Sequence, residues 1–331
     1  MKILVTGGAG FIGSVLVNLL SEKGFDVRVL DSFLFGSSHI SDVKNVDLMH
    51  GDVRDASAVC AALDGVDAVV HLAGIVGEPA CNVDRTANLS TNIISNKLLF
   101  EAMTNKFADN VNRLIYVSSC SVYGNVQGMY DAVDESTPTM PLSTYAAAKL
   151  ESERMLFEYA ALNSTFSPTV LRLTTIFGWS PRPRADLVTN AFALNAMKGR
   201  PITIYGGGGQ YRSLIHVHDV ASAVLAVLES PRYAVDRQIF HVGDENNNKT
   251  VAEIAELVKK VVPETVIKHM DGMPADRRDY RIQCNKICNA LHWQARFSVE
   301  DGIRDFVDNA RKSNLDLDDP LKYRNDKIVY K

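Results

Sequence analysis

Two side chains four residues apart could move a proton: Tyr145 and Lys149, in the run Tyr-Ala-Ala-Ala-Lys. If this run is helical, the spacing places both side chains on one face. A phenol is a poor base because its reference pKa is about 10. A nearby ammonium favours the phenolate, which can take a proton from an alcohol. Such pairs are also common on ordinary surface helices, so the assignment depends on what surrounds the pair.

A serine-rich stretch upstream supplies that context. Residues 118–124 read Ser-Ser-Cys-Ser-Val-Tyr-Gly and follow an apolar run expected to be a strand. Open α/β sheets bind their ligands at the carboxyl ends of the strands. A hydroxyl at this position could orient a substrate oxygen and share its proton.

A glycine-rich turn near the N-terminus is typical of phosphate binding. Residues 6–13 read Thr-Gly-Gly-Ala-Gly-Phe-Ile-Gly, between an expected strand and an expected helix. Glycine permits the tight turn, the close approach of backbone to a pyrophosphate, and close packing of helix on strand. The helix N-terminus offers N–H groups to the phosphates.

Asp31 follows Gly13 by eighteen residues. A carboxylate there accepts hydrogen bonds from an adenosine ribose and repels a 2′-phosphate, so NAD is expected rather than NADP. A simple cap or loop role is the alternative for Asp31.

The elements that would position these residues alternate in type. Short β-branched runs predict strands at 3–6, 27–31, 67–72, 113–118, 169–173 and 238–242. Amphipathic segments predict helices at 11–23, 55–63, 86–105, 144–161, 186–197, 217–228, 250–261 and 299–312. This rhythm predicts an α/β fold with a doubly wound parallel sheet, because parallel strands need crossover helices.

The second half is less regular and predicts a smaller C-terminal substrate-binding lobe. We expect a Rossmann domain over 1–173 plus about 210–242. The lobe would comprise about 174–209 plus 243–331, and its polar tail, 315–331, is expected to wrap the surface.

Composition excludes several classes of protein. The chain has 331 residues and a net charge of −4, so it is not expected to bind nucleic acid or a membrane surface. No apolar run reaches the roughly 18 residues that span a bilayer. The N-terminus reaches its glycines too early for a signal peptide. Five scattered cysteines favour free thiols in the cytoplasm, and no ligand set for a metal accompanies them.

Together these motifs resemble the NAD-dependent epimerase/dehydratase group of extended short-chain dehydrogenases. The likeness covers nearly the whole chain, and its motifs occur in the family's order. They are residues 6–13, Asp31, 51–53, 71–74, 118–124, Tyr145 with Lys149, 171–173, 209–220 and 242–243. They are specific for family and cofactor, and much less so for reaction.

The resemblance implies roles for individual residues. Tyr145 would be the base, Lys149 would bind the nicotinamide ribose, and Ser119 would be the catalytic hydroxyl. The expected NAD contacts are Gly7, Gly10, Phe11, Ile12, Gly13, Asp31, Asp52, Val53, Leu72, Ala73, Gly74 and Asn92, besides Tyr145 and Lys149. The expected contacts with a nucleotide-diphosphate sugar are Ser119, Ser121, Asn190, Arg212 and Arg278. Arginine suits the diphosphate because its planar fork bonds phosphate oxygens in pairs.

Departures from the family pattern narrow the reaction. Sugar 4,6-dehydratases of the family carry acidic residues directly before Val-Tyr-Gly, where this chain has Cys120 and Ser121. Neither can act as a carboxylic acid, which argues against 4,6-dehydration. Cys120 is interpreted as a small buried residue rather than as an acid/base. Two stretches, 77–81 and 180–190, are expected to be loops at the sugar pocket.

We therefore expect a nucleotide-sugar C4 epimerase that acts through a transient 4-keto sugar. A C4 dehydrogenase or 4-keto reductase stays open, because a nucleotide-heptose C4 dehydrogenase carries a stretch similar to 180–190. A non-catalytic NAD-binding protein is the third hypothesis, disfavoured by the intact Tyr145–Lys149 pair. The resemblance also implies a homodimer formed through a four-helix bundle of helices 86–105 and 144–161.

Overall fold

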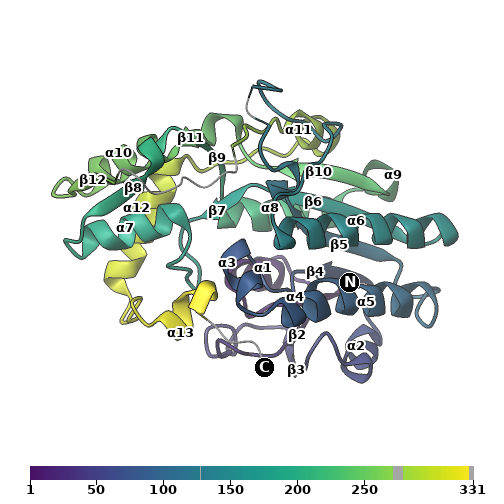
Figure 1. The fold of residues 1–331 in the computed structure, drawn as a ribbon. Helices are drawn as coiled ribbons and strands as arrows, with labels where there is room; N and C mark the ends of the chain where they lie inside the picture. The colour runs from purple at the N-terminus through teal and green to yellow at the C-terminus, as the bar shows by residue number, and fades with distance from the viewer. Residues whose placement is uncertain (127, 271–278, 328–331) are drawn as a thin grey trace.

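A central parallel sheet organises the chain in the computed structural model, which describes residues 1–126, 128–270 and 279–327. Its strand order is β10-β6-β5-β4-β1-β2-β3, and every pair is parallel (Figure 1). The strands are β1 (Lys2–Thr6), β2 (Asp26–Asp31), β3 (Val46–His50), β4 (Ala68–His71), β5 (Arg113–Ser119), β6 (Ser167–Leu173) and β10 (Gln238–Val242). The predicted doubly wound α/β fold is confirmed.

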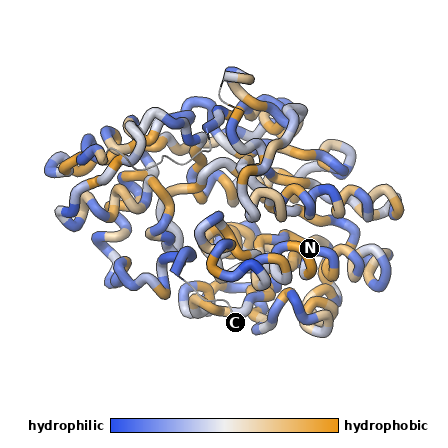
Figure 2. The backbone as a smooth tube through the Cα atoms, in the orientation of Figure 1, coloured by the Kyte–Doolittle hydropathy of each residue, from blue (hydrophilic) through white to orange (hydrophobic). Residues whose placement is uncertain are grey.

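Alternating side chains of each strand enter two cores, one on each face of the sheet. In β1, Ile3 and Val5 pack in one core, while Leu4 packs in the other. The first core is completed by α1 (Phe11–Glu22), α8 (Val217–Glu229) and α11 (Asn285–Leu291); the second by α2 (Ala56–Leu63), α5 (Ser95–Thr104) and α6 (Thr144–Leu162). Each fully buried aliphatic side chain stabilises the fold by roughly 1.5–3 kcal/mol. In Figure 2, orange hydrophobic stretches run through the interior and blue stretches gather in outer loops.

A smaller lobe lies beside the sheet and has its own core (Figure 1). It contains β7 (Thr175–Phe177), β9 (Tyr211–His216) and β11 (Asn248–Thr250) in one sheet, and β8 (Ile202–Tyr205) with β12 (Ile267–Met270) in another. Its helices are α7 (Val188–Met197), α10 (Val251–Val261) and α12 (Val299–Lys312). The short elements of the chain are α3 (Glu78–Val83), α4 (Arg85–Leu89), the π-helical turn η1 (Ser90–Ile94), η2 (Cys120–Tyr123), η3 (Gly206–Gly208), α9 (Arg232–Val235), η4 (Glu245–Asn247), α13 (Pro320–Tyr323) and η5 (Asn325–Lys327). The segment of about 210–242, predicted to belong to the Rossmann domain, contributes to both parts. Its strand β9 pairs within the lobe, whereas its helix α8 packs on α1. The domain limits given above therefore stay a prediction.

Several local predictions were wrong. The segment expected to be one helix over 86–105 is interrupted by η1. Residues 78–81 were expected in a loop and are helical, with Pro79 in the first turn of α3. The described part of the tail, residues 315–327, is mostly exposed or half-buried as expected, with Leu317 and Asn325 buried. None of the helices in the described residues is long and apolar enough to cross a membrane.

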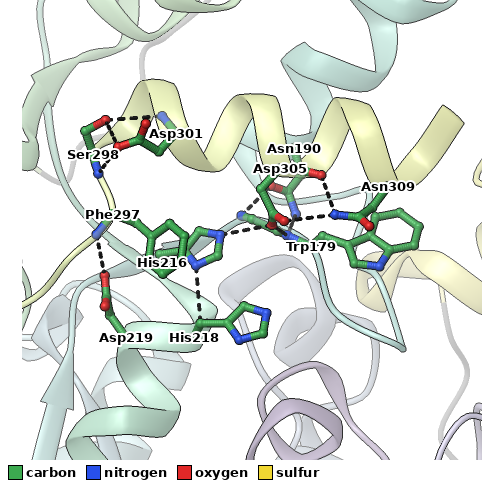
Figure 3. A network of polar contacts seen from close by, with 11 residues as sticks. Trp179, Asn190, His216, His218, Asp219, Phe297, Ser298, Asp301, Asp305 and Asn309 are labelled. Atoms are coloured by element: carbon green, nitrogen blue, oxygen red, sulfur yellow. Dashed lines mark hydrogen bonds and ion pairs between the residues drawn. The ribbon is translucent and has the colours of Figure 1, made fainter. Parts of the chain in front are cut away.

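Within the lobe, a buried histidine at the end of β9 packs against the chain that leaves β7 (Figure 3). His216 stacks on Phe297, with ring centroids 4.1 Å apart, and its Nε2 lies 3.1 Å from an Asp305 carboxylate oxygen. The same oxygen accepts the backbone N–H of Trp179 at 3.0 Å. Gly178 has a φ of +96°, and a Cβ there would lie 2.0 Å from His216 Nε2. Only glycine therefore fits where the chain leaves β7.

Replacing Gly178 with alanine should destabilise the protein through both backbone strain and this collision. We expect Gly178→Ala to lower the free energy of unfolding by about 3 kcal/mol or more. The matched control is Gly199→Ala, because Gly199 has a φ of +65° and nothing within 4 Å of its missing Cβ; its expected loss is about 1 kcal/mol. Urea unfolding measures both, and equal losses would contradict the steric argument.

Candidate active site

Tyr145 is the second residue of α6, the helix that carries the proposed proton-transfer pair. The Ser143 hydroxyl accepts the backbone N–H of Ala146 at 3.1 Å and thereby caps α6. Tyr145 lies in the first turn and packs with Ile75, Ala80 and Cys81. The stretch 77–81 therefore lies against the phenol as part of α3.

Lys149 is buried one turn further along α6. Its Nζ donates to the carbonyl oxygen of Val117 in β5 at 2.8 Å, and it lies 4.9 Å from the ring centroid of Tyr116. Burial lowers the pKa of Lys149 to about 8, against the opposing influence of Cys81 and Glu153. At neutral pH the ammonium form still predominates, so a positive charge lies on the same helical face as the phenol.

The serine-rich stretch lies where β5 ends, as expected. Ser119 caps η2 by accepting the backbone N–H of Ser121 at 3.2 Å. The Ser121 hydroxyl oxygen is buried without a hydrogen-bond partner in the described residues. Cys120 points into the core, its Sγ 3.3 Å from the Arg172 carbonyl oxygen, and burial raises the pKa of its thiol.

A buried ion pair, which the sequence reading missed, lies behind these residues. Both carboxylate oxygens of Glu153 accept hydrogen bonds from the guanidinium of Arg172 in β6, and the closest contact is 2.6 Å. It also accepts the Ser118 hydroxyl. Arg172 donates to the Tyr123 hydroxyl at 2.6 Å, which in turn contacts His241 Nε2 at 2.6 Å. The signal available in the sequence was the position of Glu153, a further four residues after Lys149.

A cavity of about 420 Å³ lies at the carboxyl ends of β1, β2 and β4. That volume is within the usual range for ligand pockets. Eleven of the residues predicted to contact NAD line it together: Gly7, Gly10, Phe11, Ile12, Gly13, Asp31, Asp52, Val53, Leu72, Ala73 and Gly74.

The glycine turn fits a dinucleotide for geometric reasons. Gly7 has a φ of +73°, and a Cβ there would lie 2.8 Å from the backbone nitrogen of Ala73. A Cβ on Gly13 would lie 2.3 Å from the Gly7 carbonyl oxygen. Asp31 is fixed by the backbone N–H groups of Ala9 at 2.9 Å and Phe33 at 2.8 Å. The turn thus presents bare backbone to the cavity, with an oriented carboxylate at its edge.

Asn92 does not line the cavity but holds one of its walls. Within the π-turn η1, its side-chain oxygen accepts Ile75 N–H at 3.0 Å, and its nitrogen donates to Ile75 O at 2.8 Å. A Cβ on Gly74 would lie 2.6 Å from that side-chain oxygen. Direct contact between Asn92 and NAD stays a prediction.

His71 ties the same wall to the helices behind it. Its Nδ1 lies 2.7 Å from the Thr6 hydroxyl and its Nε2 lies 2.7 Å from the Asn96 side-chain oxygen. Asn96 also donates to Ser152 of α6 at 2.9 Å. Burial, assisted by the charge of Lys149, lowers the pKa of His71 to about 4.

The predicted substrate contacts are less uniform. Arg212 lies on β9 and donates to the carbonyl oxygen of Tyr211 at 2.7 Å. The Asn190 amide makes three bonds to the backbone of Gly178 and Arg184, so it braces a loop; its contact with substrate stays a prediction. Arg278 lies outside the described residues.

The loop expected at the sugar pocket reaches the cofactor cavity. Arg182 and Arg184 line it, as does Asn325 of the tail. Sequence reasoning missed all three as cavity residues, because contacts between segments this far apart in the chain leave no local signal.

Comparison with known proteins decides the family. The model of the NAD dependent epimerase/dehydratase family matches residues 3–243. The chain belongs to this family. A dTDP-glucose 4,6-dehydratase of Streptomyces niveus is 29% identical, over 97% of this chain and 96% of that protein.

Solved structures agree with this assignment. A UDP-glucose 4-epimerase of Thermus thermophilus in complex with NAD is 28% identical, with a TM-score of 0.79 over 94% of this chain and 99% of that one. A dTDP-glucose 4,6-dehydratase of Bacillus anthracis in complex with NAD is 26% identical, with a TM-score of 0.83 over 97% of this chain and 100% of that one. The protein is thus an NAD-dependent enzyme of the nucleotide-sugar epimerase/dehydratase family.

Breaking the buried ion pair should cost far more stability than breaking an exposed one. We expect Glu153→Gln to lower the free energy of unfolding by about 3–5 kcal/mol, because Arg172 keeps its charge in the interior. Glu151→Gln is the control on the same helix; it removes an exposed pair with Arg154 and should cost about 0.5 kcal/mol or less. Similar losses for the two variants in urea unfolding would contradict the expected difference between the buried and the exposed ion pair.

His71 should make the protein less stable as the solution is acidified. Between pH 6.5 and 4 this histidine binds a proton in the unfolded chain but not in the native protein. The free energy of unfolding therefore decreases as the pH is lowered through this range. The His71→Gln variant lacks this contribution. Its stability deficit relative to wild type should therefore shrink by roughly 2–3 kcal/mol between pH 7 and pH 4.5. The deficit should stay constant from pH 7 to 8. A deficit that also stays constant down to pH 4.5 would contradict the lowered pKa of the native His71.

Proposed function

We propose that this enzyme is a nucleotide-sugar epimerase that acts through a transient 4-keto sugar, with Tyr145 as the base. The observation that carries the proposal is the Tyr145–Lys149 face of α6 beside the end of β5, where the residues after Ser119 hold no carboxyl group. The expected substrate is a nucleotide-diphosphate sugar, with Arg212 and Arg278 as diphosphate contacts.

Tyr145 would transfer the proton of the C4 hydroxyl. The Lys149 ammonium stabilises the phenolate, and the Val117 carbonyl holds that ammonium in place. The phenolate then takes the proton of the C4 hydroxyl, while Ser119 orients the same oxygen. When bound, NAD supplies reversible uptake of a hydride from C4. The 4-keto sugar turns over in the pocket, and Tyr145 returns its proton when the other face is reduced.

The surroundings of Ser119 argue against loss of water from the sugar. Removal of a C6 hydroxyl needs an acid to protonate the leaving oxygen. Cys120 faces the core with a raised thiol pKa, and Glu153 is committed to Arg172 and Ser118. Ser121 can donate and accept a hydrogen bond, which suits a sugar hydroxyl better than acid catalysis.

A nucleotide-sugar C4 dehydrogenase or 4-keto reductase is the second candidate, favoured by the resemblance of residues 180–190 to such a dehydrogenase. The same side chains would move the proton. Net formation of NADH, or accumulation of a 4-keto product, would favour this candidate over the epimerase.

We also propose a cytoplasmic homodimer. All five cysteines are free thiols, as suits a reducing compartment. Ile94, in the segment 86–105 expected to form the dimer, is 61% exposed, and Leu162, at the end of α6, is 88% exposed. A monomer in sedimentation at micromolar concentration would oppose the dimer.

The reaction can be tested by incubating the enzyme with UDP-, GDP- and dTDP-sugars and following the products by NMR. We expect interconversion of a C4 pair, whereas a 4-keto-6-deoxy product would mean dehydration. Tyr145→Phe should lower kcat by about 10²- to 10⁴-fold, because the general base is lost.

Tyr159→Phe is the matched control. Tyr159 lies on the same helix, and its hydroxyl donates to Glu101 at 2.9 Å, far along α6 from the pair. This variant should turn over normally, and both variants should keep NAD. Full activity of Tyr145→Phe would overturn the proposed mechanism.

A further inference from the structure

One acidic side chain on α3 has no partner that explains it. Glu78 is half-buried in the first turn of this helix, and among the described residues its carboxylate forms no hydrogen bond or ion pair. It does not cap the helix either, because the N-cap residue is Gly77. A partly buried charge without a partner costs stability. Its place in the molecule therefore points to a ligand.

The helix that carries Glu78 lies between the cofactor cavity and the proposed base. Val76, two residues before Glu78, lines the cavity after the end of β4. Cys81, one turn after it, packs with Tyr145. The η5 turn, whose Asn325 also lines the cavity, contacts α3 as well. Glu78 thus belongs to the wall where the cavity approaches the reacting side.

Helical spacing places Glu78 on the flank of α3 that meets the start of α6. Residues three and four apart lie on one side of a helix, so Glu78 is aligned with Cys81 and Asn82. Cys81 packs with Tyr145, and the Asn82 side-chain oxygen accepts the Thr144 hydroxyl at 3.3 Å. Both contacts of this flank are therefore with the first turn of α6.

The charges around Cys81 agree with this placement. Burial raises the pKa of the Cys81 thiol to about 12, while the charge of Lys149 opposes this rise and that of Glu78 adds to it. The thiol is thus near both the ammonium of the proton-transfer pair and the carboxylate of Glu78. The wall of the reacting side carries a negative charge as well as a positive one.

A carboxylate in this wall distinguishes sugars by charge. It accepts hydrogen bonds from hydroxyl groups and attracts an ammonium group, whereas it repels another carboxylate. Tyr145 is proposed to act at C4, so the groups nearest to Glu78 are those on the carbons beside C4. A uronic acid carries its carboxylate there, on the carbon attached to C5.

We propose that Glu78 is a specificity-determining residue, which favours sugars with a hydroxyl or ammonium group beside C4 and excludes uronic acids. The substrate class is then a nucleotide-linked neutral or amino sugar. This inference rests on the proposed function, because it requires a nucleotide-diphosphate sugar with its C4 at Tyr145. The carboxylate acts in binding and transfers no proton.

Binding can be measured without turnover in the full-length protein with NAD bound and with Tyr145→Phe as background. Calorimetry compares three pairs: UDP-glucose with UDP-glucuronic acid, GDP-mannose with GDP-mannuronic acid, and dTDP-glucose with dTDP-glucuronic acid. In the pair that binds, the neutral sugar should bind about 10-fold more tightly or better, because like charges repel across an interface. Adding Glu78→Gln should reduce this preference by about 10-fold, since the repelling charge is removed.

Glu151→Gln is the matched control. It removes the same charge from the exposed side of α6, where Glu151 pairs with Arg154 at 2.9 Å, and it should leave the preference unchanged. Glu78→Gln should unfold at the same urea concentration as its parent, because the side chain has no partner to lose among the described residues. Glu78→Lys should reverse the preference in favour of the uronic acid.

Three results would overturn the role of Glu78 while leaving the proposed function intact. They are a preference for the uronic acid before the substitution, an unchanged preference in Glu78→Gln, and an equal change in Glu151→Gln. A 4-keto-6-deoxy product that forms with Tyr145 intact and is lost in Glu78→Gln would also overturn it, because Glu78 would then be the acid of a dehydration. If no nucleotide sugar binds at all, the proposed function itself is refuted.

Discussion

Burial of charge on one face of α6 is the constraint on which the rest of the site depends. Tyr145, Lys149 and Glu153 are spaced four residues apart, so all three project toward the sheet. A buried ion costs several kcal/mol unless it is partnered. The partners come from two strands: a β5 carbonyl for Lys149 and Arg172 of β6 for Glu153. A helix that shifted by one turn would leave both charges unpartnered, and this penalty fixes the position of Tyr145.

Buried hydrogen bonds link the Tyr145–Lys149 helix to the cavity wall formed by the ends of β1 and β4. His71 and Asn96 connect β1 and β4 to Ser152, which lies between Lys149 and Glu153 on the buried part of α6. Asn92 fixes the Gly74–Ile75 backbone from the neighbouring π-turn. The wall beside the expected nicotinamide and the helix that carries the proposed base are thus parts of one hydrogen-bonded unit.

What the sequence could reveal follows from how local each signal is. Strand β1 was predictable as a short, unbroken apolar run that ends at a glycine turn, and α8 because its apolar side chains recur at helical spacing. The edge strand β3 was not, since its outward residues are polar and it buries little. Three signals could be read because their spacing and their places after predicted strands together imply a geometry. They are the turn at 6–13, Asp31 and the Tyr145–Lys149 pair. Glu153 with Arg172, and Arg182 with Phe35, depend on segments that meet only after folding.

The family resemblance leaves the outcome of the reaction to a few side chains. Oxidation at C4 is common to epimerisation and dehydration, so the Tyr145–Lys149 pair cannot distinguish them. Dehydration adds one requirement, an acid beside the departing hydroxyl. The two positions after Ser119 offer a thiol turned into the core and a small hydroxyl. Neither side chain is a carboxylic acid, and this is the ground on which epimerisation is proposed rather than dehydration.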